Sequence, residues 1–128
     1  MGGKSSRTKG HNFERAVARL LRPLFPDARR GKQYSDGRET DVEGTPFRIQ
    51  CKRQKGITWG DALRAIAQEE TDAETWDDPR PVIAVCRADR EKSYVIMKLS
   101  TARTIVERFF WRPEGADIIH FPQRKDEE

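Results

Sequence analysis

The sequence predicts a single-domain α/β fold in which helices flank a mixed β-sheet. Apolar residues recur at helical spacing in three segments, while other short segments alternate or run continuously, as strands do. These segments follow the order α-β-β-α-β-β-α-β without an internal repeat or a long linker, so one sheet with helices packed on it is expected. The 128 residues divide into a flexible basic arm at 1–9, one domain at 10–123 and a charged tail at 124–128.

The first helix is expected to begin at Asn12, a favourable N-cap residue, and to end or kink near Pro23. Its apolar stripe consists of Phe13, Ala16, Val17, Leu20, Leu21 and Leu24. Glu14 lies at the edge of this stripe, so it can face a neighbouring element without entering the core.

Two strands joined by a turn are expected next, at about 39–43 and 47–53. The turn is Gly44-Thr45-Pro46. In the second strand, a period of two places Phe47, Ile49 and Cys51 on the core face. The same period places Arg48, Gln50 and Lys52 on the opposite face, which we expect to be the accessible one.

The rest of the chain is expected to contain two helices and three strands. The helices are predicted at about 60–74 and 101–110, and the strands at 82–86, 94–99 and 118–121. Thr58 or Asp61 is expected near the cap of the first of these helices, and Ser100 is expected to cap the second. Leu63, Ile66 and Ala67 are expected to face inward.

Composition excludes several classes of protein. No apolar run is long enough to cross a membrane, and the N-terminus lacks the apolar stretch of a secretory signal. Cys51 and Cys86 each lie in a predicted strand, so we interpret them as reduced core residues of a cytoplasmic protein. His11 and His120 are far apart in sequence, which disfavours a structural zinc site.

The basic residues are concentrated in the first half of the chain. Residues 1–55 hold 14 Lys/Arg and 6 Asp/Glu, whereas residues 56–128 hold 11 and 15. A basic surface suits a polyanionic partner bound through its phosphates. The alternative is a solvated, arginine-rich surface with no partner.

Asp41, Gln50 and Lys52 form the pattern that carries chemistry. Strand alternation places Gln50 and Lys52 on one face, about 7 Å apart along the strand, and a hairpin can return that face to Asp41. Carboxylate, amide and main-chain oxygens are ligands that Mg²⁺ or Mn²⁺ favour. A lysine beside such a metal can orient water or stabilise phosphate charge. On spacing alone, a hairpin with an exposed polar face explains the pattern equally well.

The first half of the chain resembles a known nuclease family. The resemblance lies in Lys9-Gly10-His11-Asn12-Phe13-Glu14-Arg15, Glu39-Thr40-Asp41-Val42 and Phe47-Arg48-Ile49-Gln50-Cys51-Lys52-Arg53, with a basic, serine-containing loop between the first two. In these segments the chain resembles the archaeal-type Holliday junction resolvases, which also occur in phages, within the PD-(D/E)XK nuclease superfamily. The resemblance covers about residues 9–70 well. The remainder of the chain resembles the family only in the order of its elements.

The resemblance implies a restriction-endonuclease-like core and a homodimer that nicks two strands of a four-way DNA junction with Mg²⁺ or Mn²⁺. The host would be a prokaryotic cell or a phage-infected one. Glu14 would match the helix acid of the family, Asp41 its central metal ligand and Lys52 its catalytic lysine. The main-chain carbonyl of Cys51 would be a further metal ligand, and Ser35 would match a serine near the cleaved phosphate.

Gln50 departs from the family, which usually has a carboxylate at this position. An amide oxygen can bind a metal, but glutamine carries one negative charge fewer and cannot act as a base. We therefore expect metal binding through Glu14, Asp41, Gln50 and the Cys51 carbonyl to be weaker, and function to be kept.

Other residues have a functional and an ordinary interpretation. The candidate phosphate contacts are Lys4, Arg7, Lys9, Arg29, Arg30, Lys32, Arg53 and Lys55. Glu39 and Glu43 are candidates for accessory metal ligands, but solvent-facing acids are the favoured interpretation. Gln68 is a candidate contact to DNA or to the lysine. The aromatic residues Trp59, Trp76, Phe109, Phe110 and Trp111 are candidates for packing, a dimer interface or base stacking.

Two rival functions stay open at this level. The same site would serve a repair or restriction-type nuclease acting on mismatched, flapped or duplex DNA. A DNA-binding protein with a decayed site is the rival of another class, and Gln50 makes it conceivable.

Overall fold

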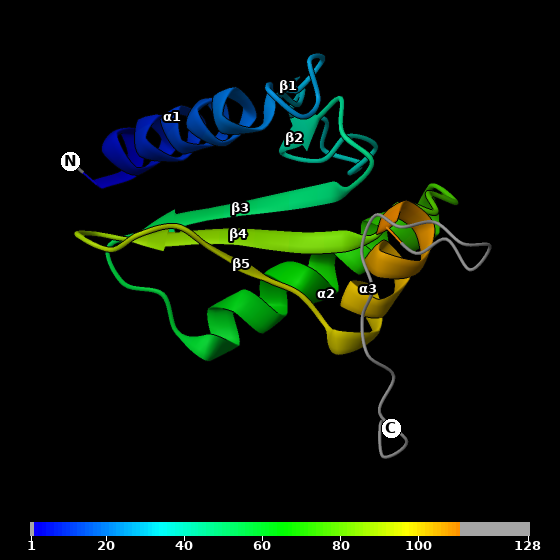
Figure 1. The fold of residues 1–128 in the computed structure, drawn as a ribbon. Coiled ribbons are helices and arrows are strands. Elements are labelled where there is room, and N and C mark those ends of the chain that lie inside the picture. The colour runs from blue at the N-terminus through cyan, green and yellow to red at the C-terminus, as the bar shows by residue number, and fades with distance from the viewer. Residues whose placement is uncertain (1, 111–128) are drawn as a thin grey trace.

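The computed structural model of this protein describes the backbone of residues 2–110 and the side chains of residues 7–110. In this part of the chain it is a small α/β domain with a five-stranded mixed sheet and three α-helices, as the sequence predicts. Figure 1 shows helix α1 on one side of the sheet and helix α2 on the other. None of the described helices is both long and apolar enough to cross a membrane.

Helix α1 spans Gly2–Leu21, so the prediction that Asn12 caps it is wrong. Residues 2–9 belong to this helix and not to an extended arm; their flexibility stays a prediction. No proline interrupts them, and once the segment after Phe13 is docked on the sheet, each added residue gains a helical hydrogen bond. The end of the helix is as predicted: the Leu24 N–H donates to the Leu21 carbonyl, 3.0 Å away, in a turn around Pro23.

The sheet has the order β1-β2-β3-β4-β5. Its strands are Arg29–Arg30, Val42–Glu43, Arg48–Gln54, Val82–Ala88 and Tyr94–Ile96. Strands β3 and β4 are parallel and are joined through helix α2, whereas the other three pairs are antiparallel. Strand β1 falls in the segment that we expected to be a basic loop, and β2 and β5 are shorter than predicted.

The face of the sheet under α1 holds the larger core. Phe13, Val17 and Ala18 of α1 pack there against apolar residues of three strands. These strand residues are Val42, Ile49, Ile83 and Val85. Leu20 and Leu24, which we placed in the apolar stripe, are 75% and 73% exposed. Leu20 lies in the last turn of α1, and Leu24 lies beyond its last residue, Leu21.

Helix α2, Trp59–Thr75, covers the other face of the sheet. Thr58 caps it in a capping box with Asp61, as expected. Its buried stripe is Ala62, Ala65, Ile66, Glu69 and Ala73. The prediction that Ile66 faces inward is confirmed, whereas the prediction for Leu63 and Ala67 is wrong, because both are exposed beside this stripe.

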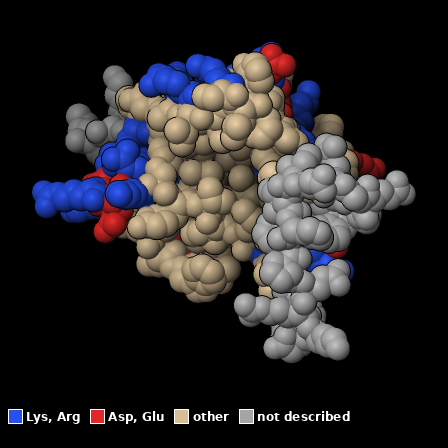
Figure 2. Space-filling view, viewed as in Figure 1, with Lys and Arg blue, Asp and Glu red and all other residues tan. Residues whose placement is uncertain are grey.

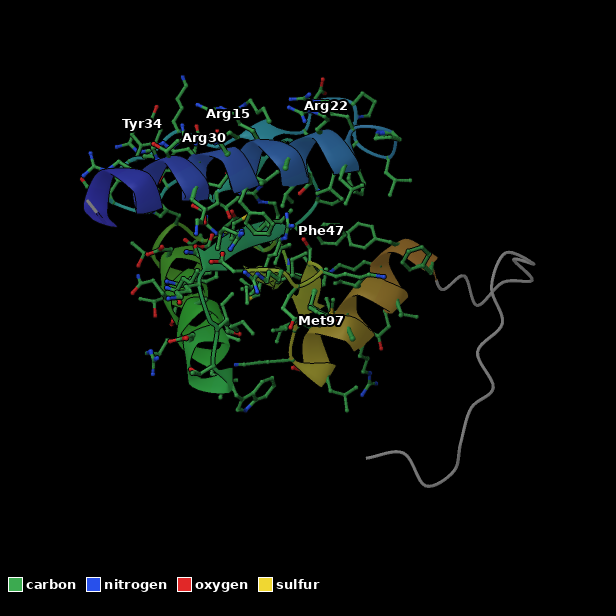
Figure 3. The ribbon with its side chains drawn as sticks, turned by 90° about the vertical axis from the view of Figure 1, so that its left-hand side faces the viewer. Arg15, Arg22, Arg30, Tyr34, Phe47 and Met97 are labelled. Atoms are coloured by element: carbon green, nitrogen blue, oxygen red, sulfur yellow. The ribbon has the colours of Figure 1, made fainter. Side chains whose placement is uncertain are left out.

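Helix α3, Leu99–Ile105, begins with Lys98 as its N-cap and not with Ser100, which corrects the predicted cap. It continues into a π-helical turn at Val106–Phe110. Phe47 makes edge-to-face ring contacts with Phe25 and Phe109, at 5.8 and 5.7 Å between centroids. Figure 3 shows Phe47 and Met97 between the sheet and α3. The strand expected at 118–121, the tail and Trp111 lie outside the described residues.

Candidate functional site

The hairpin between β2 and β3 brings Asp41 against the centre of β3. Gly44 forms its turn with φ +81°, and a Cβ there would lie 2.1 Å from the Asp27 carbonyl oxygen, so only glycine fits. The Asp41 N–H donates to the Ile49 carbonyl at 3.0 Å. The Cys51 N–H donates to Asp41 Oδ2 at 2.8 Å. The carboxylate is thus bound to the backbone between Gln50 and Lys52.

Glu14 is the second acid of this site. It lies on α1, nearly fully buried, and accepts a 2.7 Å hydrogen bond from Arg30 Nε. Burial raises the pKa of Glu14, although its hydrogen bond with Arg30 and the charges of Arg30 and Arg15 oppose this. Its placement at the edge of the helix stripe is as predicted, and Arg15 and Arg30 both lie beside α1 in Figure 3.

Electrostatics join Asp41 to two of the other predicted residues, Glu14 and Lys52. Burial and the charge of Glu14 together raise the pKa of Asp41 to about 6, while the Cys51 N–H, the Gln33 side chain and the Lys52 ammonium oppose the rise. Glu14 and Lys52 therefore each act electrostatically on Asp41. Gln50 and Lys52 are both half-buried on β3.

We call Glu14, Asp41, Gln50 and Lys52 the Asp41 site. Its protein groups are two carboxylates, one amide and one ammonium, beside the main chain of Cys51. Among the described residues, no group of three His, Cys, Asp or Glu side chains is arranged to hold a metal ion. A metal at this position would therefore need the amide or a main-chain oxygen as a further ligand.

Ser35 is exposed in the loop between β1 and β2. In the described part of the chain, no contact joins it to the Asp41 site. Its loop is fixed at a different place: the Arg38 guanidinium lies over the Tyr34 ring at 4.4 Å and over Trp76 at 5.3 Å. Trp76 Nε1 also donates to the Asp36 carbonyl at 2.9 Å. The role predicted for Ser35 stays a prediction.

Four of the candidate phosphate contacts form ion pairs in the structure. Lys9 and Arg53 both contact Asp89 Oδ1, at 3.2 and 2.6 Å. Arg30 pairs with Glu14, as described above, and Arg29 pairs with Glu39 at 3.1 Å. The pairs with Asp89 link α1 to the ends of β3 and β4, and the pair of Arg30 with Glu14 links α1 to β1. All four pairs reduce the positive charge that the cations present to a partner.

Three other candidates, Arg7, Lys32 and Lys55, are exposed. The side chain of Lys4 lies outside the described part. Figure 2 shows Lys and Arg side chains gathered over α1 and at the left end of the sheet, with few over the centre of the face in view. The basic surface is therefore at the edge of the molecule where α1 meets the sheet.

Two expectations about charged residues are wrong. Arg48, placed on the accessible face of β3, is completely buried under α2. Glu43, interpreted as a solvent-facing acid, is buried and pairs with Arg80 at 2.9 Å. Strand alternation separates two faces, but it does not reveal that helices cover both of them.

Sequence reasoning also missed three residues around Asp41. Gln33 hydrogen-bonds its carboxylate, and Thr40 and Glu69 lie behind it. A signal existed for Glu69, because it continues the helical spacing of Ala62, Ala65, Ile66 and Ala73. Gln68 is exposed and donates to Asp72 at 3.2 Å, so no described contact joins it to the lysine.

An apolar groove lies between α2, β5 and the start of α3. Its lining residues are Trp59, Leu63, Ile66, Ala67, Glu70, Ile96, Met97, Lys98 and Leu99. None of these belongs to the Asp41 site, so the groove and the acids are separate features of the surface.

Comparison of the chain with family models, with curated proteins and with solved structures finds no match.

Proposed function

We propose that this protein is a metal-dependent endodeoxyribonuclease that resolves four-way DNA junctions, with a core of the restriction-endonuclease-like type. One observation carries the proposal. The Cys51 N–H donates to Asp41 Oδ2 at 2.8 Å, so the carboxylate is bound to the backbone of β3 next to Gln50 and Lys52 in the sequence. Glu14 faces the same carboxylate from α1. Such a set of groups suits hydrolysis of a phosphodiester.

The donor set fits Mg²⁺ or Mn²⁺. Asp41 is a buried carboxylate whose pKa is raised to about 6 by burial and by the charge of Glu14. Two acids that repel each other in a partly dry site are stabilised by a divalent cation. Asp41 and Glu14 would bind the ion, with the Gln50 amide and the Cys51 carbonyl as further oxygen ligands. The bound ion would supply an acidified water and charge neutralisation at the phosphate.

The protein groups would divide the remaining work. The Lys52 ammonium would stabilise negative charge on the phosphate or orient the attacking water. Gln50 would help to position the metal without acting as a base, because a neutral amide does not accept a proton near neutral pH. Ser35 is retained as a candidate contact to the cleaved phosphate.

The substrate proposal rests on charge and symmetry. The exposed cations Arg7, Lys32 and Lys55 lie in the half of the chain that carries the excess of basic residues. Phosphate contacts of this kind bind DNA by shape and not by sequence. A homodimer would present two such sites to the two symmetric strands of a four-way junction.

A cleavage assay on a substrate panel tests the function. Purified protein with Mg²⁺ or Mn²⁺ should nick a synthetic four-way junction at paired positions, and it should cut a duplex or a flap of the same sequence far more slowly. Asp41→Asn, purified in parallel, shows whether the cleavage comes from this protein. Equal cutting of all three substrates would make it a nuclease of broader use and would refute the junction assignment.

A DNA-binding protein without cleavage is the second candidate. Gln50 in place of a carboxylate and the 2.7 Å engagement of Glu14 by Arg30 favour it, because both reduce the negative charge available to a metal. If the wild type binds the junction but cuts none of the three substrates with either metal, this candidate is correct and the nuclease proposal fails.

A further inference from the structure

Arg48 is a buried cation that joins three separate segments. Its side chain is 0% exposed. Nε donates to Glu69 Oε1 of α2 at 3.0 Å, and Nη1 donates to Asp78 Oδ2 in the loop before β4 at 3.1 Å. Nη2 donates to the Gly37 carbonyl in the β1–β2 loop at 2.7 Å. A guanidinium with its donors satisfied in three directions fixes these segments relative to β3.

A second arginine extends the ion pairs towards β2. Arg80 contacts Asp78 at 2.8 Å and Glu43 at 2.9 Å. We call Arg48, Glu69, Asp78, Arg80 and Glu43 the Arg48 network. Glu43 Oε2 in turn accepts the Thr40 N–H at 2.8 Å, so the network reaches the residue before Asp41.

Thr40 is hydrogen-bonded through both its backbone N–H and its hydroxyl. Besides the bond of its N–H to Glu43, its hydroxyl donates to the Ile49 carbonyl. Burial raises the pKa of Glu69 and a hydrogen bond from the same hydroxyl lowers it, so the Ile49 carbonyl and the Glu69 carboxylate share the single hydroxyl proton. The Ile49 carbonyl also accepts the Asp41 N–H, at 3.0 Å. The backbone that carries the Asp41 carboxylate is therefore fixed from beneath, by buried groups that do not touch the site.

We propose that Glu69 and Thr40 are positioning residues for Asp41, held in place by Arg48. This inference rests on the proposed nuclease function, because it deepens the account of the same site. The contacts give a specific route: Arg48 orients Glu69, Glu69 and Glu43 fix Thr40, and Thr40 sets where the next residue places its carboxylate. A displacement of less than 1 Å at Asp41 would weaken the chemical step without weakening DNA binding.

The amide of Cys51 reports on this route without any enzymatic assay. Its N–H donates to Asp41 Oδ2, so its proton resonance and its hydrogen exchange depend on where that carboxylate lies. Asp41→Ala gives the reference signal for the lost bond. Glu69→Gln and Thr40→Val are close in shape to the natural residues, so at least one of them is expected to fold.

The matched control is Glu70→Gln, the same chemical change one residue along α2. Glu70 is only partly buried and pairs with Lys98 at 2.9 Å, away from Thr40. In Glu69→Gln and in Thr40→Val, the Cys51 amide should exchange about tenfold faster and its resonance should shift towards that of Asp41→Ala. Glu70→Gln should leave both as in the wild type.

Cleavage kinetics provide the second measurement. At saturating metal and DNA, the single-turnover rate should fall about tenfold in Glu69→Gln and Thr40→Val, with DNA affinity unchanged. The positioning role is overturned if the exchange and resonance of the Cys51 amide in both variants match those in Glu70→Gln, while Asp41→Ala changes them. If the wild type does not cleave DNA, the proposed function fails separately, and the amide measurement still decides whether Glu69 and Thr40 position Asp41.

Discussion

Two groups of charged residues, the Arg48 network and the Asp41 site, differ in how their charges are paired. In the Arg48 network, two guanidinium groups serve three carboxylates. Hydrogen bonds with Arg80, among other contacts, hold the pKa of Asp78 down at about 2 against the effect of burial. At the Asp41 site, burial and the charge of Glu14 raise the pKa of Asp41 to about 6.

The difference separates a scaffold from a site. Buried carboxylates that share arginine partners contribute to holding segments together, provided that no partner is removed, even though burial raises the pKa of Glu69 in this network. A buried carboxylate kept beside another acid is unfavourable for the free protein, and such groups concentrate at functional sites. The contrast predicts that equal chemical changes in the two regions have opposite effects on stability and activity.

Outside Asp41, the largest effect is expected from Lys52→Ala. Loss of the ammonium removes charge stabilisation at the phosphate, so the cleavage rate should fall by about 10²–10⁴-fold. Lys92→Ala is the control, because Lys92 is exposed in the turn before β5 and is not among the proposed DNA contacts. Equal rates for the two variants would remove Lys52 from the site.

Arg48→Met should cause the largest loss of stability. It leaves the buried carboxylates of Glu69 and Asp78 without their shared cation, so the free energy of unfolding should fall by about 3–5 kcal/mol. Arg64→Met is the control, since the Arg64 side chain is 74% exposed and pairs with Asp61 on the surface of α2; its effect should stay under about 0.5 kcal/mol. Urea unfolding measures both, and similar losses would contradict the assignment of a scaffold.

Acid should weaken the Arg48 network through Asp78. Its folded pKa of about 2 lies below the ordinary value of 3.8, so the stabilisation is present above about pH 4 and is lost as the pH falls towards 2. The shift corresponds to about 2 kcal/mol for a side chain that is mostly buried. Urea unfolding of wild type and Asp78→Asn should differ at pH 5 and converge near pH 2. A constant difference would show that Asp78 contributes through packing.

The smallest effect is expected at the surface. Lys9 pairs with Asp89 at 3.2 Å with both side chains more than a third exposed, so Lys9→Met should change the free energy of unfolding by less than about 0.5 kcal/mol. If Lys9 releases Asp89 to contact a phosphate, junction binding should lose about one unit of salt dependence. An unchanged salt dependence would remove Lys9 from the DNA surface.

The sequence predicts the local structure that carries Asp41, Gln50 and Lys52, because patterns within short segments determine it. Strand alternation places Gln50 and Lys52 together, and Gly44 sets the turn that returns β2 to β3. The edge position of Glu14 follows from helical spacing on α1. Each of these features depends on residues close together in the chain, where spacing is informative.

The scaffold behind the site could not be predicted in this way. Arg48 was placed in the open because nothing local shows that α2 crosses its face, and Glu43 was misplaced for the same reason. Arg80, the partner of Glu43, lies 37 residues from it in the chain, and Glu69 lies 21 residues from Arg48. Contacts at such separations arise from tertiary packing, which periodicity does not encode.

A matched pair of aspartate variants tests the central contrast most directly. Asp41→Asn and Asp78→Asn make the same chemical change, one in the Asp41 site and one in the Arg48 network. Cleavage of the junction and the melting temperature are measured for both variants. We predict that Asp41→Asn abolishes cleavage without lowering the melting temperature, since it removes a repelled charge and keeps an acceptor for Cys51. Asp78→Asn should lower the melting temperature by about 5–10 °C and keep cleavage within about threefold. If Asp41→Asn still cleaves the junction and is destabilised as much as Asp78→Asn, then Asp41 belongs to the scaffold and the proposed site is wrong.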